Sequence, residues 1–278
     1  MAELPIQYAD FATWQRRRLQ GDALEKHLGY WRKQLADKPR LAIPTDFPRS
    51  SVTVYSEDYI RSQVSAKQSE QLRTLSWMED ATLFMTFFTV FQVLMCQFTG
   101  QRDMPICIEI SSRHLRETED LVGLFTHVLP IRAPISGDPS FRELLRQVRG
   151  AALDVYAYQG IPIARLVELC DPGRDLTAMP IVSATVAYLN ENVLLAPQKT
   201  PRLSLKPYRL GPEEEQEDLN LQIYDLARGL EVALVYHSGL FQRDTVARLL
   251  DTYHHLLSAI VADPDKRLSE LQKGQSEH

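Results

Sequence analysis

The most apolar window of the chain is FMTFFTVFQVLMCQF, residues 84–98, and its apolar residues follow a helical period. They form a wide stripe along a helix, made of Phe84, Phe87, Phe88, Phe91, Leu94, Met95 and Phe98. A membrane span needs about 20 mostly apolar residues, whereas this window is shorter and contains threonine and glutamine. Thr99-Gly100 ends it. We therefore expect residues 84–98 to form the most buried helix in the core of a soluble protein.

Helix and strand patterns alternate on both sides of this window. In chain order, they predict two amphipathic helices between Tyr8 and Leu35 that meet near Gly21, a proline-punctuated linker over Pro39–Pro48, a strand over Tyr59–Val64, a helix from Lys67 that breaks near Glu79 and Asp80, apolar strand-like runs over Pro105–Ile110 and Leu121–Ile131, helices over Phe141–Tyr158 and Pro162–Cys170, strands over Ile181–Leu189, Leu203–Tyr208, Leu219–Tyr224 and Leu230–Tyr236, and a last helix over Gln242–Val261. This order predicts an α/β fold with a mixed sheet flanked by helices. We expect all strands after Ile181 to join one sheet.

Composition narrows the class of partner. The chain has 278 residues, 44% of them hydrophobic, and a formal net charge of -5. It can bury a full core, and it lacks the basic surplus that nucleic acids and anionic membranes attract. The N-terminus has neither a basic start nor an apolar signal core. We expect a cytoplasmic protein that binds proteins or small molecules, with no nucleic acid and no membrane.

Cysteines and known catalytic motifs give little indication of the protein's function. Cys96, Cys107 and Cys170 are widely spaced, form no Cys-x-x-Cys pair and have no histidine at metal-ligand spacing. We interpret all three as reduced structural residues, because a nucleophilic cysteine needs an exposed, electropositive setting. The sequence also lacks a Gly-x-Ser-x-Gly elbow, a phosphate-binding glycine loop and a His-Glu-x-x-His motif. No metal site or directly bound cofactor is expected.

A series of motifs carries a family resemblance instead. Tyr8-Ala-Asp-Phe-Ala-Thr-Trp14, followed by Leu28-Gly-Tyr-Trp-Arg-Lys-Gln-Leu35, resembles the Tyr-x-Asp-Phe-Ala-x-Trp motif of nonribosomal peptide synthetase condensation domains. Further matches follow in family order at Ala81–Thr86, Val122–Arg132, Gly137–Leu144, Tyr158–Pro162, Arg174–Pro180 and Ala262–Ser269. Together they make nearly the whole chain similar to the C-terminal lobe of that family.

The resemblance implies a lobe related to chloramphenicol acetyltransferase. Two such lobes form a V, with the active site in a tunnel between them and carrier proteins at its mouths. Substrates arrive on the phosphopantetheine arms of carrier proteins, so this chain itself need not bind a cofactor. We expect a single condensation-type lobe, with a helical segment and linker over residues 1–50, the α/β lobe over 51–271 and a tail over 272–278.

The family's catalytic motif, His-His-x-x-x-Asp-Gly, belongs to the N-terminal lobe and does not occur in this sequence. The pair His254-His255 has no Asp-Gly after it, and we interpret it as a helix-surface pair. Arg113 matches a family arginine that resembles an inter-lobe partner of the motif's aspartate. We expect it to meet another carboxylate such as Glu109, to face solvent, or to meet a separate chain that supplies the first lobe.

Departures from the family pattern cluster where the tunnel would lie. Glu109 stands where the family has a Gly-Thr-Pro segment, His127 replaces an asparagine, and Tyr158 replaces a histidine. Either these positions have drifted in a non-catalytic lobe, or Glu109 and His127 form a new acid/base pair, since a carboxylate beside an imidazole raises its basicity. We expect the tunnel or inter-lobe surface to include Ser111, Ser112, Arg113, Tyr158 and Gln159.

Three functions stay open. The chain is half of a split or truncated condensation domain that contributes to amide formation, or a non-catalytic module that docks a carrier protein or tailoring enzyme, or a stand-alone acyl-transfer enzyme that uses Glu109 and His127. In the first two, an inner face with Arg113 and the Leu121–Ile131 segment lacks support within the chain. Such a face should bind a partner lobe, a carrier protein or a second copy in a homo-oligomer.

Overall fold

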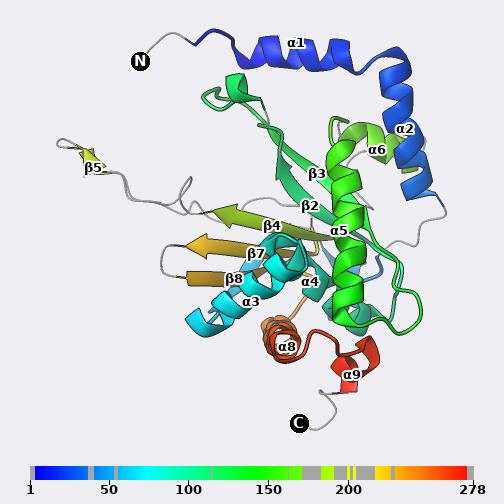
Figure 1. Ribbon diagram of the computed structural model, residues 1–278, viewed down its shortest axis with the longest axis vertical. Coiled ribbons are helices and arrows are strands. Elements are labelled where there is room, and N and C mark those ends of the chain that lie inside the picture. Colours follow the sequence, from blue (N-terminus) through cyan, green and yellow to red (C-terminus); the bar gives the residue numbers. More distant parts are fainter. Residues whose placement is uncertain are drawn as a thin grey trace.

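A six-stranded mixed sheet forms the centre of the computed structural model (Figure 1). Its strands are β1 (Glu57–Gln63), β2 (Pro105–Ser111), β3 (Thr126–Arg132), β4 (Ala184–Asn190), β7 (Leu219–Leu226) and β8 (Gly229–His237), in the spatial order β1-β8-β7-β4-β2-β3. β4 runs parallel to β2 and β7, and the other neighbours are antiparallel. The structure describes residues 4–36, 41–52, 56–113, 115–161, 163–170, 183–190, 199–200, 203–204, 217–226 and 229–273. The predicted α/β fold with a mixed sheet is confirmed.

Helices precede, separate and follow the strands, as the apolar periods predicted. They are α1 (Tyr8–Arg18), α2 (Gly21–Leu35), α3 (Ala66–Met78), α4 (Leu83–Thr99), α5 (Phe141–Ala157), α6 (Ile163–Cys170), α8 (Arg243–Ala262) and α9 (Leu268–Lys273), with short 3-10 turns η1 (Arg49–Ser51) and η2 (Arg116–Thr118). Local chemistry sets their starts. Ser140 and Glu143 form a reciprocal capping box at the start of α5, which satisfies two backbone donors that a helix end leaves unpaired.

α4 is the central helix of the core. Every residue from Met85 to Cys96 is buried, so the prediction of a deeply buried helix is confirmed. The Thr82 side chain accepts a hydrogen bond from the Met85 amide, and Gly100 ends the helix at φ 73°, a left-handed conformation that glycine tolerates.

Within the described ranges no single helix has the length and apolarity to cross a membrane. α3 and α4 reach both only as a pair, bent by 101°.

The two faces of the sheet differ in polarity. One face carries branched apolar residues such as Ile106, Val186 and Leu221, which share a buried cluster with α4, α5 and α8. Side chains alternate between the faces along each strand. The register therefore places Glu109 and Asn220 together on the opposite face. Helices thus cover one face, and polar side chains gather on the other.

The sheet forks between β2 and β4. These strands pair at Cys107–Thr185 and Ile108–Val186, whereas β4 pairs with β7 along its whole length. Beyond this contact β2 and β4 diverge, as Figure 1 shows. In α/β proteins, crevices at the carboxyl ends of parallel strands are frequent ligand sites. The fork therefore locates the region where a site is expected.

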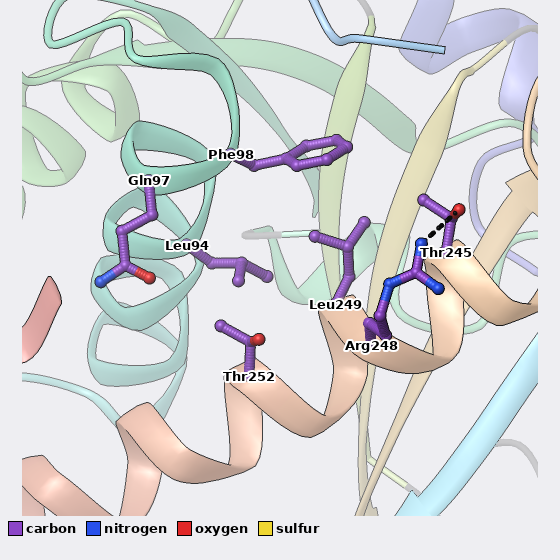
Figure 2. A pocket seen from close by; sticks show the side chains of 7 residues that line it. All are labelled: Leu94, Gln97, Phe98, Thr245, Arg248, Leu249 and Thr252. Carbon is purple, nitrogen blue, oxygen red and sulfur yellow. Dashed lines mark hydrogen bonds between the residues drawn. The ribbon is translucent and has the colours of Figure 1, made fainter. Parts of the chain in front are cut away.

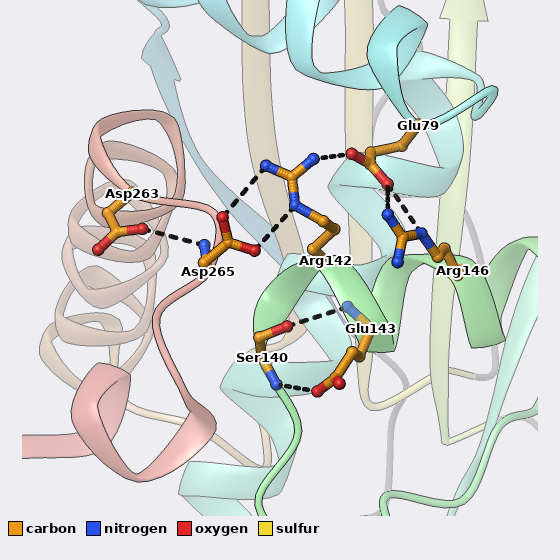
Figure 3. Close-up of polar contacts among 7 residues, drawn as sticks. All are labelled: Glu79, Ser140, Arg142, Glu143, Arg146, Asp263 and Asp265. Atoms are coloured by element: carbon orange, nitrogen blue, oxygen red, sulfur yellow. Dashed lines mark hydrogen bonds and ion pairs between the residues drawn. The ribbon is translucent and has the colours of Figure 1, made fainter.

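The predicted break near Glu79 is a turn held by arginines of α5 (Figure 3). The buried Glu79 carboxylate contacts the Arg142 guanidinium and lies 3.0 Å from the guanidinium of Arg146. Arg142 also pairs with Asp265, at 2.9 Å, just after α8. One buried carboxylate therefore connects the α3–α4 turn to α5 and, through Arg142, to the segment behind α8.

The expectation that every strand after Ile181 joins one sheet is wrong. β6 (Leu203–Ser204) pairs with β5 (Lys199–Thr200) in a separate two-stranded sheet, and Figure 1 shows β5 far from the main sheet. An apolar strand pattern predicts an extended chain but does not specify its partner. The proline-punctuated linker also contributes to the core, because Leu41 and Ile43 are buried there.

Candidate functional site

The β2–β3 hairpin carries most of the site residues predicted from the sequence. Its register pairs Glu109 with Val128 and Ile110 with His127. Directly opposed residues of an antiparallel pair lie on the same face, and successive residues lie on opposite faces. Glu109 and His127 therefore point to opposite sides of the sheet. The expectation that they form an acid/base pair is wrong in this geometry.

The surroundings of the two residues differ accordingly. Glu109 is partly buried on the polar face, where its Oε1 accepts a hydrogen bond from Nδ2 of Asn220 at 3.2 Å. His127 is partly buried on the face that the helices cover, opposite Ile110. A proton passes directly only between groups at hydrogen-bond distance. The two side chains therefore belong to separate environments.

Arg113 is held within its own loop. Its guanidinium donates to the carbonyl oxygen of Thr118 and to that of Glu119 at 3.4 Å. Its Cζ atom lies 4.0 Å from the centre of the Phe125 ring, a cation–π contact. Among the described residues no carboxylate pairs with Arg113. The Arg113 guanidinium therefore binds backbone carbonyls around η2, and not Glu109 as one of the expectations had it.

The two serines of the hairpin have different exposures. Ser112 is buried, and its amide and hydroxyl both donate to the Phe125 carbonyl, at 2.7 and 2.9 Å. Ser111 is exposed, and its Oγ accepts from the Arg113 amide at 3.3 Å. Ser112 therefore closes the loop, and Ser111 lies at the surface beside it.

The start of α1 packs against the tip of this hairpin. Phe11, Leu121 and Phe125 form a buried cluster separate from the main core, and the Tyr8 ring meets Phe125 edge-on at 5.2 Å between centroids. A Cβ atom on Gly123 would lie 2.2 Å from the Tyr8 ring, so this approach requires glycine. Residues of the first motif and of the hairpin motif therefore form one packing unit, which we call the α1–hairpin cluster.

The Leu121–Ile131 segment is consequently supported within the chain, contrary to expectation. Leu121 and Phe125 are each 3% exposed beneath α1. Val122 and Leu124 point outward and are 93% and 73% exposed. The exposed apolar surface of this segment is therefore confined to the tip of the hairpin.

Tyr158 and Gln159 follow the end of α5. The Tyr158 ring stacks on Tyr30 with centroids 4.2 Å apart and planes within 8°. Its carbonyl accepts a hydrogen bond from Nε1 of Trp31 at 3.2 Å, and Gln159 is partly buried. Tyr158 thus anchors α2, which carries the second half of the N-terminal motif, to α5. The expected tunnel role of both residues stays a prediction.

The interpretation of His254-His255 as a surface pair is wrong for the first residue. Nε2 of His254 lies 2.5 Å from Oγ of Ser62 in β1, and burial lowers the pKa of His254. His255 is exposed. Successive residues of a helix point about 100° apart, so only one of two adjacent histidines can face the sheet.

Cys96 and Cys107 are both buried, and burial raises the pKa of Cys96. Their interpretation as reduced structural residues stays a prediction. The Cys170 side chain and the Arg174–Pro180 motif lie outside the described part of the chain. Within that part, no group of three or more histidine, cysteine, aspartate or glutamate side chains could hold a metal ion.

A groove separates the end of α4 from the start of α8 (Figure 2). It has a volume of about 260 Å³ and is lined by Leu94, Gln97, Phe98, Thr245, Arg248, Leu249 and Thr252. Nη2 of Arg248 donates to the Thr245 hydroxyl at 2.9 Å. Arg248 is exposed, and the described residues of the lining include no group that could act as a base near neutral pH. This groove therefore lacks the features of an active site.

A cavity of about 360 Å³ lies at the fork between β2 and β4. Its described lining comprises Thr82, Leu83, Phe84, Glu109, Ile110, Tyr156 and Tyr188, of which only Glu109 is charged. The Tyr188 hydroxyl donates to Asp225 at 2.6 Å, and Asp225 pairs with Arg73 at 2.6 Å. Burial raises the pKa of both tyrosines. The sequence has no local signal for Tyr156 and Tyr188, because only the folded chain brings these residues of α5 and β4 to one cavity.

The sheet order and the helical layer define a mixed α/β fold. Residues 1–277 match the protein family described as "Condensation domain". The chain therefore belongs to the condensation-domain family.

Curated relatives are much longer proteins. The chain is 39% identical over 272 residues to one of the linear gramicidin synthase proteins of Brevibacillus parabrevis, an alignment that covers 98% of this chain and 5% of that protein. It is 31% identical over 271 residues to chondramide synthase cmdD of Chondromyces crocatus, covering 98% of this chain and 7% of that protein. This chain thus corresponds to a small part of each of these synthases.

Solved structures share the fold. The X-domain in a complex with OxyB from teicoplanin biosynthesis superposes with a TM-score of 0.83 at 22% identity, covering 98% of this chain and 61% of that one. SgcC5 from Streptomyces globisporus gives a TM-score of 0.78 at 23% identity, covering 95% of this chain and 61% of that one. At these identities the likeness concerns the fold alone.

Proposed function

We propose that this chain is the C-terminal lobe of a nonribosomal peptide synthetase condensation domain and that a lobe with His-His-x-x-x-Asp-Gly completes it. The observation that carries the proposal is the family match over residues 1–277 in a sequence without that motif. The motifs that follow one another in family order support it. In this view residues 1–50 and 51–271 act as one lobe in the cytoplasm, together with carrier proteins and other synthetase modules.

The proposed reaction joins two carrier-bound substrates. The amine of the acceptor attacks the thioester carbonyl of the donor, a C–N bond forms, the C–S bond breaks, and the thiol of the donor's phosphopantetheine leaves. The amine loses a proton, and the thiolate gains one. This chain contributes a tunnel wall, for which the β2–β3 hairpin and Tyr158 with Gln159 are the candidates, while the proton-transfer group comes from the other lobe.

Arg113 has a structural part in this proposal. Its guanidinium already binds backbone carbonyls and the Phe125 ring. Arg113 therefore stabilises the conformation of the hairpin tip and does not serve as a contact to the other lobe. The exposed Val122 and Leu124 are then the side chains available for contact with the other lobe.

A non-catalytic docking module is the second candidate. The observation that favours it is the separation of Glu109 from His127, the acid/base pair that was predicted for a stand-alone enzyme. The fold likeness to an X-domain solved in complex with OxyB adds an example of a condensation-type fold that binds another protein.

The test combines the purified chain with donor and acceptor carrier proteins loaded with aminoacyl groups. We expect a dipeptidyl product, detected by mass spectrometry, only when a lobe with the His-His-x-x-x-Asp-Gly motif is added. Product from the chain alone that disappears in His127→Ala would instead support the stand-alone enzyme. A stable complex with a carrier or tailoring protein, without product under either condition, would support the docking module.

Size-exclusion chromatography tests the contact surface. The double variant Val122→Ser, Leu124→Ser should weaken association with the added lobe, because it removes exposed apolar area at the hairpin tip. Trp77→Ser is the matched control, since Trp77 is 80% exposed at the end of α3. Equal association of all three proteins would contradict this choice of surface.

A further inference from the structure

The cavity at the fork is an opening in the main hydrophobic core. Its described lining includes apolar and aromatic side chains from four elements, namely Leu83 and Phe84 of α4, Ile110 of β2, Tyr156 of α5 and Tyr188 of β4. All of these side chains are only partly buried, and all pack against the core cluster. The cavity volume of about 360 Å³ lies within the range of small-ligand sites. A ligand that enters here therefore extends the apolar core.

The cavity lies where α/β folds commonly bind ligands. Ile108 pairs with Val186, so Ile110 and Tyr188, two residues further along, lie on one face near the carboxyl ends of two parallel strands. We propose that this cavity binds an uncharged aromatic ring with one hydrogen-bonding group at its edge, the chemistry of a phenol. The identification of this ring as the side chain of a carrier-bound aminoacyl group rests on the proposed function, whereas binding of a free phenol does not.

The charged side chains around the cavity point away from it or are paired with each other. Successive residues of β2 point to opposite faces, and the Glu109 carboxylate accepts from Asn220 on the face opposite to Ile110. Asp225, which accepts from the Tyr188 hydroxyl, forms an ion pair with Arg73 at 2.6 Å. A charged ligand would lose its hydration without gaining an opposite charge, which is costly. The described lining therefore favours a neutral ligand.

The rings of the lining favour an aromatic ligand. Aromatic pairs prefer edge-to-face or offset arrangements, which stabilise them beyond the area that they bury. The Tyr188 ring is held in place by the bond from its hydroxyl to Asp225. Phe84 packs against Phe88, with ring centroids 6.0 Å apart. Two rings of the cavity are therefore fixed in position for contact with a further ring.

Tyr156 supplies the hydrogen-bonding group. It is partly buried, and its hydroxyl makes no hydrogen bond within the described part of the chain. Burial raises the pKa of Tyr156, so its hydroxyl stays protonated near neutral pH. A phenolic hydroxyl both donates and accepts. In these largely apolar surroundings it gains a partner from a ligand with a polar atom at the ring edge, but not from a plain hydrocarbon.

Binding is measured on the full chain by NMR titration with four probes of similar size, p-cresol, toluene, benzylammonium and benzoate. We expect p-cresol to bind most tightly, about two- to tenfold more tightly than toluene, which corresponds to one neutral hydrogen bond. Both ions should bind more weakly than p-cresol. Tyr156→Phe should reduce the affinity for p-cresol to that for toluene and leave the affinity for toluene unchanged.

Leu83→Trp tests the location of the site, because the larger side chain at the start of α4 fills the cavity. It should abolish binding of p-cresol and of toluene. Leu124→Trp is the matched control, since Leu124 is 73% exposed at the hairpin tip and lies outside the described lining. It should leave binding unchanged. If Leu83→Trp does not fold, Tyr156→Phe, which keeps the ring, still decides the question.

The inference would be overturned if p-cresol does not bind, if either ion binds more tightly, or if Tyr156→Phe leaves the affinity for p-cresol unchanged. The carrier-protein assay separates it from the proposed function. Binding of p-cresol without any condensation product would leave the cavity assignment standing and count against the lobe assignment. Condensation without p-cresol binding would do the reverse. Where both hold, a carrier-bound tyrosyl group should react faster than a glutamyl group, and Leu83→Trp should remove that preference.

Discussion

α4 and the tip of the β2–β3 hairpin are held in place by different means. α4 is enclosed by apolar side chains of the sheet and of neighbouring helices over most of its length. The hairpin tip depends on Ser112, on Arg113 and on the α1–hairpin cluster. α4 is therefore held by apolar packing, whereas the tip is held by specific hydrogen bonds and ring contacts. Two of the family-like motifs, Tyr8–Trp14 and Val122–Arg132, meet in the α1–hairpin cluster, whereas α4 shows mainly an apolar period.

The largest effect is expected for Phe91→Ala in α4. Phe91 is fully buried, and its truncation leaves a cavity, so the free energy of unfolding should fall by about 3–5 kcal/mol. Trp77→Ala, at an exposed position of the adjacent helix, should change it by less than about 0.5 kcal/mol. Denaturation in urea measures both. Similar losses in the two variants would contradict the burial of α4.

Gly123→Ala tests the α1–hairpin cluster. The added methyl group would collide with the Tyr8 ring, so α1 must shift, and we expect a loss of about 1–3 kcal/mol. Limited proteolysis should then cut near the start of α1. Gly150→Ala is the matched control, because a Cβ atom there meets nothing within 4 Å. In the middle of α5 it should stabilise by about 0.5–1 kcal/mol. A harmless Gly123→Ala would disprove the close approach.

Arg113→Gln should have a smaller effect. It removes a cation–π contact at a partly exposed site and weakens the bonds to two carbonyls, a loss of about 1 kcal/mol. Hydrogen exchange should speed up locally around the hairpin tip, with little change in α4. Arg116→Gln, at an exposed position of η2, should alter neither quantity. Uniform acceleration across the core would show that the tip and α4 are not independent.

The smallest expected effect is on the pH dependence of stability, and it distinguishes His254 from its neighbour His255. Burial lowers the pKa of His254 in the folded state, so the unfolded chain binds a proton more readily and stability falls as pH drops through about 6.5. His254→Gln should flatten the pH dependence of stability between about pH 7.5 and 5. His255→Gln should leave its slope in place. Thermal melts across this range measure both, and equal slopes would argue against the partly buried position of His254.

The sequence predicted the fold better than the site. The period of residues 84–98 and the capping residues Thr82 and Ser140 are local signals, so α4 and α5 lie close to their predicted bounds. The pairing of Glu109 with His127 failed because it depends on register, and a shift of one residue moves a side chain to the other face. Nothing local specifies register.

Two further errors have the same origin in long-range structure. The acceptors of Arg113 are backbone carbonyls, which every residue carries and which no motif marks. The cavity at the fork depends on where β2 and β4 stop pairing, and it brings together Tyr156 of α5 and Tyr188 of β4 from distant parts of the chain. Such contacts become visible only once the strand order is known.

The pairing of β1 with β8 has a consequence for the timing of folding. β1 is an edge strand, and Tyr59 pairs with Val235, close to the other end of the chain. At about 5–20 residues per second, a ribosome needs roughly ten to thirty seconds to make the intervening chain. β1 therefore emerges long before β8, its neighbour in the described sheet, exists, and sheets built from such distant contacts fold slowly. The charged side chains of Glu57, Asp58 and Arg61 discourage pairing with other nascent chains during this interval, so they protect β1 in the unfinished protein as well as at the edge of the finished sheet.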